Sequence, residues 1–301
     1  MLALFGPTAA GKSALAHTAA LVMGGEIVVA DPFQRYRGLE IAADSPSDDQ
    51  RADVAYHLAG DLDVTRTSTA GDFGPRAHAV IDAIAAAGRV PIVAGGTGLY
   101  LRAALTDLEF PPDVPEQVRA DVERLVATDP DAAAHELRSE HPEAAARVDM
   151  QNPRRVARAL ELARSGAAPA RVDRLWDGST RRPTLLVGVS RPRETLDRLI
   201  AERVRREIDD GLVAEIEAAI AAPGFSRAAG QIIGVAEVIA MREGTVTADE
   251  LPGLLAKRTR RLARAQLTWL RKTPGVVELD LGDDPPQDAL PRLLDIWNAA
   301  G

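Results

Sequence analysis

Residues 6–13 read Gly6-Pro7-Thr8-Ala9-Ala10-Gly11-Lys12-Ser13, which is the full phosphate-binding loop pattern G-x-x-x-x-G-K-S. The apolar run Leu2–Phe5 before it has the composition of a buried strand, and Ala14–Val22 after it favours a helix. In this order, backbone N–H groups and the positive end of the helix can face a polyphosphate. The stretch predicts an α/β fold of the P-loop NTPase type, in which a parallel sheet is flanked by helices.

Two side chains of this loop carry the chemistry. Lys12 supplies a mobile cation, and the Ser13 hydroxyl is placed to hold Mg²⁺. Of the 36 basic residues only Lys12, Lys257 and Lys272 are lysines, so a lysine here does not reflect a lysine-rich chain. The alternative is a chance match in a glycine-rich turn, which the strand and helix in register disfavour. The loop predicts a di- or triphosphate with Mg²⁺ but does not say which one.

The composition limits the class of protein. The chain has 301 residues, 46% of them hydrophobic, which is enough for a large α/β domain with an insert. It has no cysteine, which excludes disulfides and thiolate zinc sites and suits a reducing cytosol. No apolar run approaches the ~20 residues of a membrane helix, and the chain opens directly into the first strand with no signal peptide. We predict a cytoplasmic protein without a membrane partner. Nothing in the sequence indicates oligomerisation, so we expect a monomer.

Two further strands end in residues suited to a site. Glu26–Ala30 ends at Asp31, and Val90–Ala94 runs into the second glycine loop, Gly95–Tyr100. Ligands of open α/β sheets lie at the carboxyl ends of the strands, so both segments should reach the phosphate loop. Asp31 could be a general base, could hold Mg²⁺ through water, or could simply cap a turn. Thr97 could face a ligand oxygen, or the glycines could serve only a tight turn.

Composition shifts after the proline-rich segment Glu109–Pro115, and from there to Gly178 the pattern is helical and poor in strands. We predict a helical insert over 114–178 and a P-loop core from residues 1–113 and 179–301. The last helix of the insert should begin at Pro153 with Asn152 as its N-cap. Three arginines, at 154, 155 and 158, lie opposite its apolar stripe. Such a cluster can hold the phosphates of a nucleic-acid backbone, or it can be a solvated surface.

The C-terminal third contains a strongly basic segment although the chain as a whole is acidic. The net charge is −8, which taken alone disfavours a nucleic-acid partner. However, the segment from Leu251 to Val277 contains seven Lys and Arg residues and no Asp or Glu. This helix could bind phosphates, or it could be an arginine-rich solvated face. Gln266 lies on its mainly apolar side and is either a hydrogen-bonded core amide or a site residue. A further helical stretch is predicted from Gln231 to Met241.

Taken in order, these motifs resemble one known family. They are the loop at 6–13, Asp31-x-x-Gln34-x-Tyr36-Arg37-Gly38-Leu39, Gly95-Gly96-Thr97-Gly98-Leu99-Tyr100, Asn152-Pro153-Arg154-Arg155, Gln231-x-Ile233-Gly234 and Gln266-Leu267-Thr268-Trp269. Together they are similar to the bacterial tRNA dimethylallyltransferases, or tRNA isopentenyltransferases. This resemblance implies transfer of a dimethylallyl group from its diphosphate to N6 of adenine 37 in tRNA. The adenine would have to leave the anticodon stack to react.

The resemblance also implies roles for individual residues. The loop at 6–13 would hold the donor diphosphate, with Ser13 on Mg²⁺ and Lys12 stabilising the departing pyrophosphate. Asp31 would take the proton from the adenine amine, and Thr97 would touch the same region. The helical insert would grip the anticodon arm. Residues implied to contact tRNA are Asp31, Pro32, Phe33, Gln34, Thr97, Arg119, Arg154, Arg155, Arg158, Gln231, Gly234 and Gln266.

The chain departs from the family pattern at four places. Pro32 stands where the family usually has Ser, and Ala42-Ala43-Asp44-Ser45 replaces the usual Gly-Thr-Ala-Lys. Gly234-Val235-Ala236 replaces Gly-Tyr-Lys/Arg, and Ala265 replaces a basic residue. Donor chemistry is thus better supported than the tRNA acceptor. Three alternatives stay open: an adenine-nucleotide isopentenyltransferase, a P-loop kinase of a small metabolite, and a non-catalytic RNA-binding protein.

Overall fold

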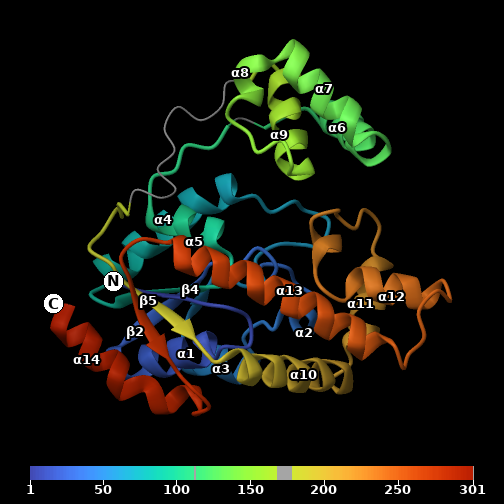
Figure 1. Ribbon diagram of the computed structural model, residues 1–301. Coiled ribbons are helices and arrows are strands. Elements are labelled where there is room, and N and C mark those ends of the chain that lie inside the picture. Colours follow the sequence, from blue (N-terminus) through green and yellow to red (C-terminus); the bar gives the residue numbers. More distant parts are fainter. Residues whose placement is uncertain (112, 168–177, 301) are drawn as a thin grey trace. The chain divides into compact units, whose positions relative to one another are not determined.

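The computed structural model describes residues 1–111, 113–167 and 178–300. The chain divides into two compact units, which are Met1–Leu108 with Arg174–Gly301 and, inserted between them in sequence, Glu109–Asp173. Figure 1 shows the elements of both units. The first unit contains the sheet and is the parallel-sheet core expected from the phosphate loop.

The sheet of the first unit has six parallel strands in the order β3-β2-β4-β1-β5-β6. All four residues of β1 are buried, as expected for a strand covered on both faces. The strands are β1 (Leu2–Phe5), β2 (Gly25–Val29), β3 (Tyr56–His57), β4 (Val90–Gly95), β5 (Leu185–Ser190) and β6 (Val276–Asp280).

The register of the central strands brings the predicted site loops together. At the end of β1, Phe5 pairs with Gly95 of β4, and at the end of β2, Val29 pairs with Ala94. The phosphate loop, Asp31 and the second glycine loop all follow directly from these three adjacent strand ends. The expectation that the carboxyl edge of the sheet gathers these segments is confirmed.

Helices cover both faces of the sheet (Figure 1). The helix α1 (Lys12–Met23) lies on one face, and α4 (Ala70–Ala86) and α5 (Gly98–Leu105) pack together on the other. The long helices α10 (Arg193–Asp209) and α13 (Leu251–Lys272) pack against each other. Smaller elements complete the unit: α2 (Glu40–Ala43), α3 (Asp48–Asp53), α11 (Leu212–Ile220), η1 (Ala229–Gln231), α12 (Val235–Arg242), η2 (Pro286–Ala289) and α14 (Leu290–Ala300).

One predicted helix is wrong in its extent. The stretch from Gln231 to Met241 is not one helix, because η1 ends at Gln231 and α12 begins only at Val235. Between them Gly234 has a φ of 109°, a backbone conformation that breaks a right-handed helix and favours glycine. The Glu237 carboxylate accepts the Gly234 N–H at 3.0 Å and fixes this break.

The second unit is a helical bundle with a core of its own. Its helices are α6 (Glu116–Thr128), α7 (Pro130–Glu140), α8 (Pro142–Ala145) and α9 (Pro153–Arg164). Val122, Leu137 and Leu160 are fully buried among small alanines. The predicted N-cap is confirmed, since the Asn152 side chain accepts the N–H groups of residues 154 and 155. This unit starts and ends a few residues before the predicted insert of 114–178. Residues 168–177, at the end of the predicted insert, lie outside the described residues.

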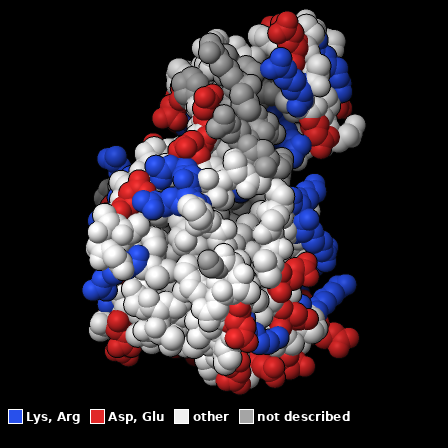
Figure 2. Space-filling view, turned by 90° about the vertical axis from the view of Figure 1, so that its left-hand side faces the viewer, with Lys and Arg blue, Asp and Glu red and all other residues white. Residues whose placement is uncertain are grey.

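In the view of Figure 2, Lys and Arg and Asp and Glu side chains lie mainly towards the edges, and a broad area without charged side chains lies between them. Many arginines of the described residues are ion-paired, among them Arg260 with Asp197 and Arg258 with Glu237. Within the described ranges, no helix is both long enough and apolar enough to cross a bilayer.

Candidate active site

The phosphate loop connects β1 to α1 and has the shape of an anion cradle. Gly11 precedes the helix with a φ of 94°, and Ala9 has a φ of 63°. A Cβ at Gly11 would also collide with the ring of Pro286, so only glycine fits here. With these φ values the loop turns around the space before α1, where the positive end of the helix lies and where N–H groups can face an anion. The loop can therefore bind phosphate oxygens without any side chain other than Lys12 and Ser13.

Two side chains from distant segments hold the loop in place. The Gln266 amide oxygen accepts the Thr8 N–H at 2.7 Å, and Gln266 is 5% exposed. The Arg191 guanidinium donates to the Ala10 carbonyl at 2.9 Å. Of the two interpretations of Gln266, the structure thus favours a core amide that supports the loop. Its predicted contact with tRNA stays a prediction, although Gln266 does line a pocket at the site.

The second glycine loop packs directly under α13. A Cβ on Gly96 would collide with the Gln266 amide, and one on Gly98 would collide with the Trp269 ring. Neither glycine has a positive φ, so the turn itself does not require glycine here. The close approach of α13 does. Thr97 is the half-buried N-cap residue of α5, and its hydroxyl makes no capping hydrogen bond. Thr97 is not among the residues that line the pockets at the phosphate loop, and its predicted role stays a prediction.

Asp31 and Lys12 attract each other through their opposite charges at the carboxyl edge of the sheet. The Asp31 carboxylate accepts the Phe33 N–H at 2.9 Å, as in the turn-capping interpretation. Burial nevertheless raises the pKa of Asp31, against the effect of that hydrogen bond and of the Lys12 charge. Burial likewise lowers the pKa of Lys12, against the charge of Asp31. A carboxylate with a raised pKa accepts a proton more readily, which fits a general base.

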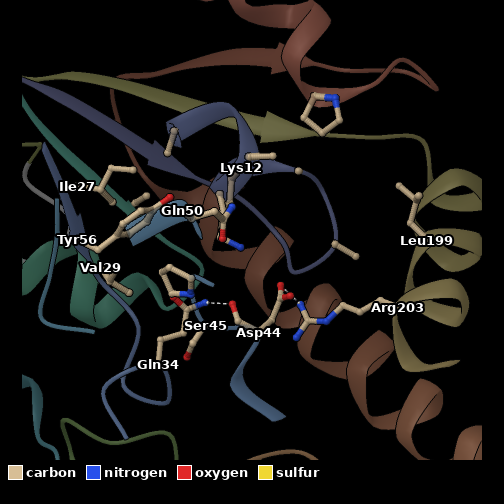
Figure 3. A pocket seen from close by; sticks show the side chains of 18 of the residues that line it. Lys12, Ile27, Val29, Gln34, Asp44, Ser45, Gln50, Tyr56, Leu199 and Arg203 are labelled. Carbon is tan, nitrogen blue, oxygen red and sulfur yellow. Dashed lines mark hydrogen bonds and ion pairs between the residues drawn. The ribbon is translucent and has the colours of Figure 1, made fainter. Parts of the chain in front are cut away.

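Arg203 is a site residue that the sequence analysis missed. It lies on α10, and its Nη1 donates to the Thr8 hydroxyl at 2.7 Å and pairs with the Asp44 carboxylate at 2.9 Å. Its Nε donates to Glu207 at 2.6 Å. Figure 3 shows Arg203 reaching from α10 towards Asp44 below Lys12. Several arginines share this helix, and no spacing in the sequence marks Arg203 as the one that meets the phosphate loop.

Two pockets meet at the phosphate loop. The first, a cavity of about 450 Å³, extends from α10 to an apolar wall that includes Ile27, Val29 and Tyr56 (Figure 3). The second contains Asp31 and apolar side chains of the segment 232–233 and of α13. Both pockets are lined by Lys12, Ser13, Gln34, Asp44 and Arg203. A phosphate ligand on the loop would therefore be reached from both sides.

Comparison with known proteins identifies the family. The family model described as IPP transferase matches residues 34–273. The chain belongs to the IPP transferase family. It is 40% identical to a tRNA dimethylallyltransferase of Kineococcus radiotolerans, over 100% of this chain and 97% of that protein. It is 41% identical to the tRNA dimethylallyltransferase of Myxococcus xanthus, over 94% of this chain and 92% of that one.

A solved structure agrees with the fold of this IPP transferase. The full-length tRNA isopentenylpyrophosphate transferase of Bacillus halodurans superimposes with a TM-score of 0.74 at 27% identity. The superposition covers 99% of this chain and 95% of that chain. The P-loop type of parallel sheet, predicted from residues 6–13, is confirmed.

The arginines of the insert differ in their exposure and in their ion pairs. Arg154 and Arg155 of the IPP transferase are exposed on α9. Arg158 pairs with Glu161 at 3.0 Å, and Arg119 lies 3.5 Å from Glu116. The nearly buried Glu161 partly neutralises the cluster. Its contact with tRNA stays a prediction.

The other residues predicted to contact RNA lie around the second pocket or next to it. Phe33 and Gln34 line this pocket beside Asp31, and Pro32 follows Asp31 directly. Gln231 is exposed, and its carbonyl accepts Arg258 at 3.1 Å. The pocket is lined by the neighbouring Ile232 and Ile233, whereas Gly234 is buried against Ile216. Ile233 belongs to the motif quoted from the sequence, whereas Ile232 does not.

Proposed function

We propose that this IPP transferase moves the dimethylallyl group from dimethylallyl diphosphate to N6 of adenine 37 in the anticodon loop of tRNA. The observation that carries the proposal is the meeting of two pockets at one phosphate loop. One pocket suits the donor, because it joins the loop to an apolar wall. The other suits the acceptor base, because it presents Asp31 among apolar side chains. The relatives named tRNA dimethylallyltransferases support a dimethylallyl donor and a tRNA acceptor.

The donor fits the first pocket by its chemistry. Its diphosphate would lie against the N–H groups at the start of α1, with Lys12 and Arg203 as cations that line the same pocket. Its five-carbon chain is apolar and needs contacts like those of the wall at Ile27, Val29 and Tyr56. A nucleoside triphosphate would instead need polar partners for its sugar and base. The pocket also offers polar side chains such as Gln34 and Gln50, so the names of the dimethylallyltransferase relatives, and not the lining, favour the prenyl donor over the kinase alternative.

The reaction is a substitution at the first carbon of the prenyl chain. The N6 nitrogen forms the new C–N bond while the bond from carbon to the diphosphate oxygen breaks. The proton of N6 passes to the Asp31 carboxylate, and pyrophosphate leaves onto the loop. An exocyclic amine is a weak nucleophile, so a base of raised pKa within reach is needed. Lys12, Arg203 and the loop N–H groups stabilise the charge that develops on the leaving oxygens.

A magnesium ion fits the oxygen donors of the site, which are the Ser13 hydroxyl and nearby carboxylates. In the described residues, no group of three or more His, Cys, Asp or Glu side chains could hold a metal. The ion would therefore need phosphate oxygens of the donor as further ligands, which is usual for Mg²⁺. When bound, it supplies Lewis-acid stabilisation of the leaving group. We propose that Ser13 is its ligand and that the enzyme works as a cytoplasmic monomer.

The test is transfer of labelled dimethylallyl, in the presence of Mg²⁺, to an unmodified anticodon stem-loop with adenine 37. AMP and ATP serve as parallel acceptors, and Asp31→Asn serves as the variant. Label in the RNA that disappears with Asp31→Asn supports the proposal. Label only in the nucleotides would move the acceptor to the adenine-nucleotide alternative. Phosphate transfer from ATP to a small metabolite would replace the proposal by a kinase.

A further inference from the structure

Asp44 places a carboxylate at the junction of the two pockets. It ends α2 with a φ of 52°, and its carbonyl accepts the Gln34 side-chain amide at 3.0 Å. Its side chain is 46% exposed and lies 2.9 Å from Nη1 of Arg203 (Figure 3). Asp44 lines both pockets together with Lys12 and Ser13. A negative charge in this place opposes the binding of a diphosphate at the loop.

Arg203 is engaged through Nε and Nη1 before any ligand arrives. Its guanidinium is 15% exposed and is shared between Asp44, Glu207 and the Thr8 hydroxyl. Nη1 already serves both Thr8 and Asp44, so a phosphate oxygen that approaches Nη1 competes with the Asp44 carboxylate for it. The Asp44 carboxylate then loses its nearest cation and faces an anionic ligand. This arrangement is unfavourable unless a second cation enters with the ligand.

Ser45, next to Asp44, contributes a further polar atom to the site. The hydroxyl oxygen of Ser45 is buried and has no hydrogen-bond partner among the described residues. Ser45 lines the first pocket next to Asp44 (Figure 3). Buried hydroxyls are nearly always hydrogen-bonded in folded proteins, so this one points to a water or ligand oxygen that completes the site.

We propose that Asp44 makes donor binding dependent on Mg²⁺. When the magnesium complex of the diphosphate binds, Arg203 exchanges Asp44 for phosphate oxygens, and Asp44 exchanges Arg203 for the ion, directly or through its water. Each charge of the resting pair thereby keeps an opposite partner. Free diphosphate, which brings no cation, is rejected by the Asp44 carboxylate. The inference rests on the proposed function in taking the ligand of the loop to be a diphosphate.

The test measures binding of inorganic pyrophosphate by titration calorimetry, in EDTA and at a fixed free Mg²⁺ concentration. The variant is Asp44→Asn, because asparagine tolerates positive φ and keeps the backbone turn. The matched control is Asp48→Asn, which removes an exposed carboxylate of the first turn of α3 that lies outside both pockets at the loop. Thermal unfolding of each variant verifies that it is folded. Because all proteins are compared at the same free Mg²⁺, complexation in solution cancels.

We expect Asp44→Asn to bind pyrophosphate at least about tenfold more tightly than the wild type in EDTA, because a like charge is removed. We expect Mg²⁺ to tighten binding strongly in the wild type and in Asp48→Asn, and only slightly in Asp44→Asn. An unchanged Mg²⁺ effect in Asp44→Asn, or unchanged binding in EDTA, would overturn the inference. Absence of pyrophosphate binding to the wild type in the presence of Mg²⁺ would overturn it as well. The proposed function fails separately, if pyrophosphate binds as expected but no prenyl group reaches RNA.

Discussion

The buried pair of Arg35 and Asp61 should respond very differently to single and double substitution. Arg35 is 1% exposed, and its Nε and Nη2 donate to the two Asp61 oxygens at 3.0 and 2.8 Å. Its remaining contacts are the Ser68 hydroxyl at 3.2 Å and the face of Phe73. Asp61→Ala leaves this guanidinium buried without an anion. Loss of one member of a buried pair costs about 3–5 kcal/mol, and we expect the free energy of unfolding to fall by that amount.

The double variant Arg35→Met/Asp61→Leu removes both charges and fills the space with apolar groups. Its free energy of unfolding should lie within about 1 kcal/mol of the wild type, since buried pairs are often replaceable in this way. The matched control is Arg76→Ala, which also loses a contact with Asp61, at 2.7 Å. Arg76 is 48% exposed, so this loss should cost no more than about 1 kcal/mol.

Equilibrium unfolding in urea, followed by circular dichroism, measures all four proteins. The pair also predicts a pH dependence. Burial acts to raise the pKa of Asp61, but its hydrogen bond to Arg35 and the two arginine charges hold it below the ordinary value. The stabilisation is therefore complete above the ordinary aspartate pKa and is lost as the pH falls through the lowered one. The reasoning is refuted if Asp61→Ala costs less than about 1 kcal/mol, or if the double variant is as unstable as Asp61→Ala.

Three further predictions concern the site and the insert. Gln266→Leu leaves the Thr8 N–H unpaired, so stability should fall by about 1–3 kcal/mol and pyrophosphate affinity should fall with it; intact affinity in calorimetry would contradict the supporting role of Gln266. Because the pKa of Asp31 is raised, kcat/KM should fall as the pH decreases through a value above the ordinary aspartate pKa, and a profile that is flat down to about pH 4 would exclude Asp31 as the base. Asn152→Ala removes the cap of α9 and should destabilise the insert by about 0.5–2 kcal/mol. Hydrogen exchange should then speed up over α9 and not in the sheet, whereas equal exchange in both proteins would show that the cap does not limit opening.

The parts of the site that could be predicted from sequence are those in which chemistry and local geometry coincide. The phosphate loop, Asp31 and the second glycine loop each follow directly from an apolar strand. Parallel strands carry their ligand-binding loops at one edge of a sheet. Recognising the strands therefore also predicts that these loops lie close together. The Asn152 cap was equally local, because it bonds residues two and three positions further on.

Short elements with no periodic pattern were not predicted. The helix α2 has only four residues, too few to show an apolar face. Two of its N–H groups, those of Ile41 and Ala42, are accepted by the Glu215 carboxylate from α11, at 2.8 and 2.9 Å. A partner some 170 residues away leaves no trace near α2. Asp44, which ends this helix, therefore stands out in the sequence only as a departure from a family pattern.

By itself the sequence determined which loop follows which strand and which chemical groups each loop carries. Both depend only on residues within one turn or at one strand end. The tertiary structure alone decided which distant side chains complete the site. Arg203 meets Thr8 across 195 positions, and Gln266 meets it across 258. Helical periodicity shows that such residues face inward, but it does not show what they face. Only the packing of α10 and α13 around the sheet turns one arginine among many into a cation of the phosphate site, and one core glutamine into its support.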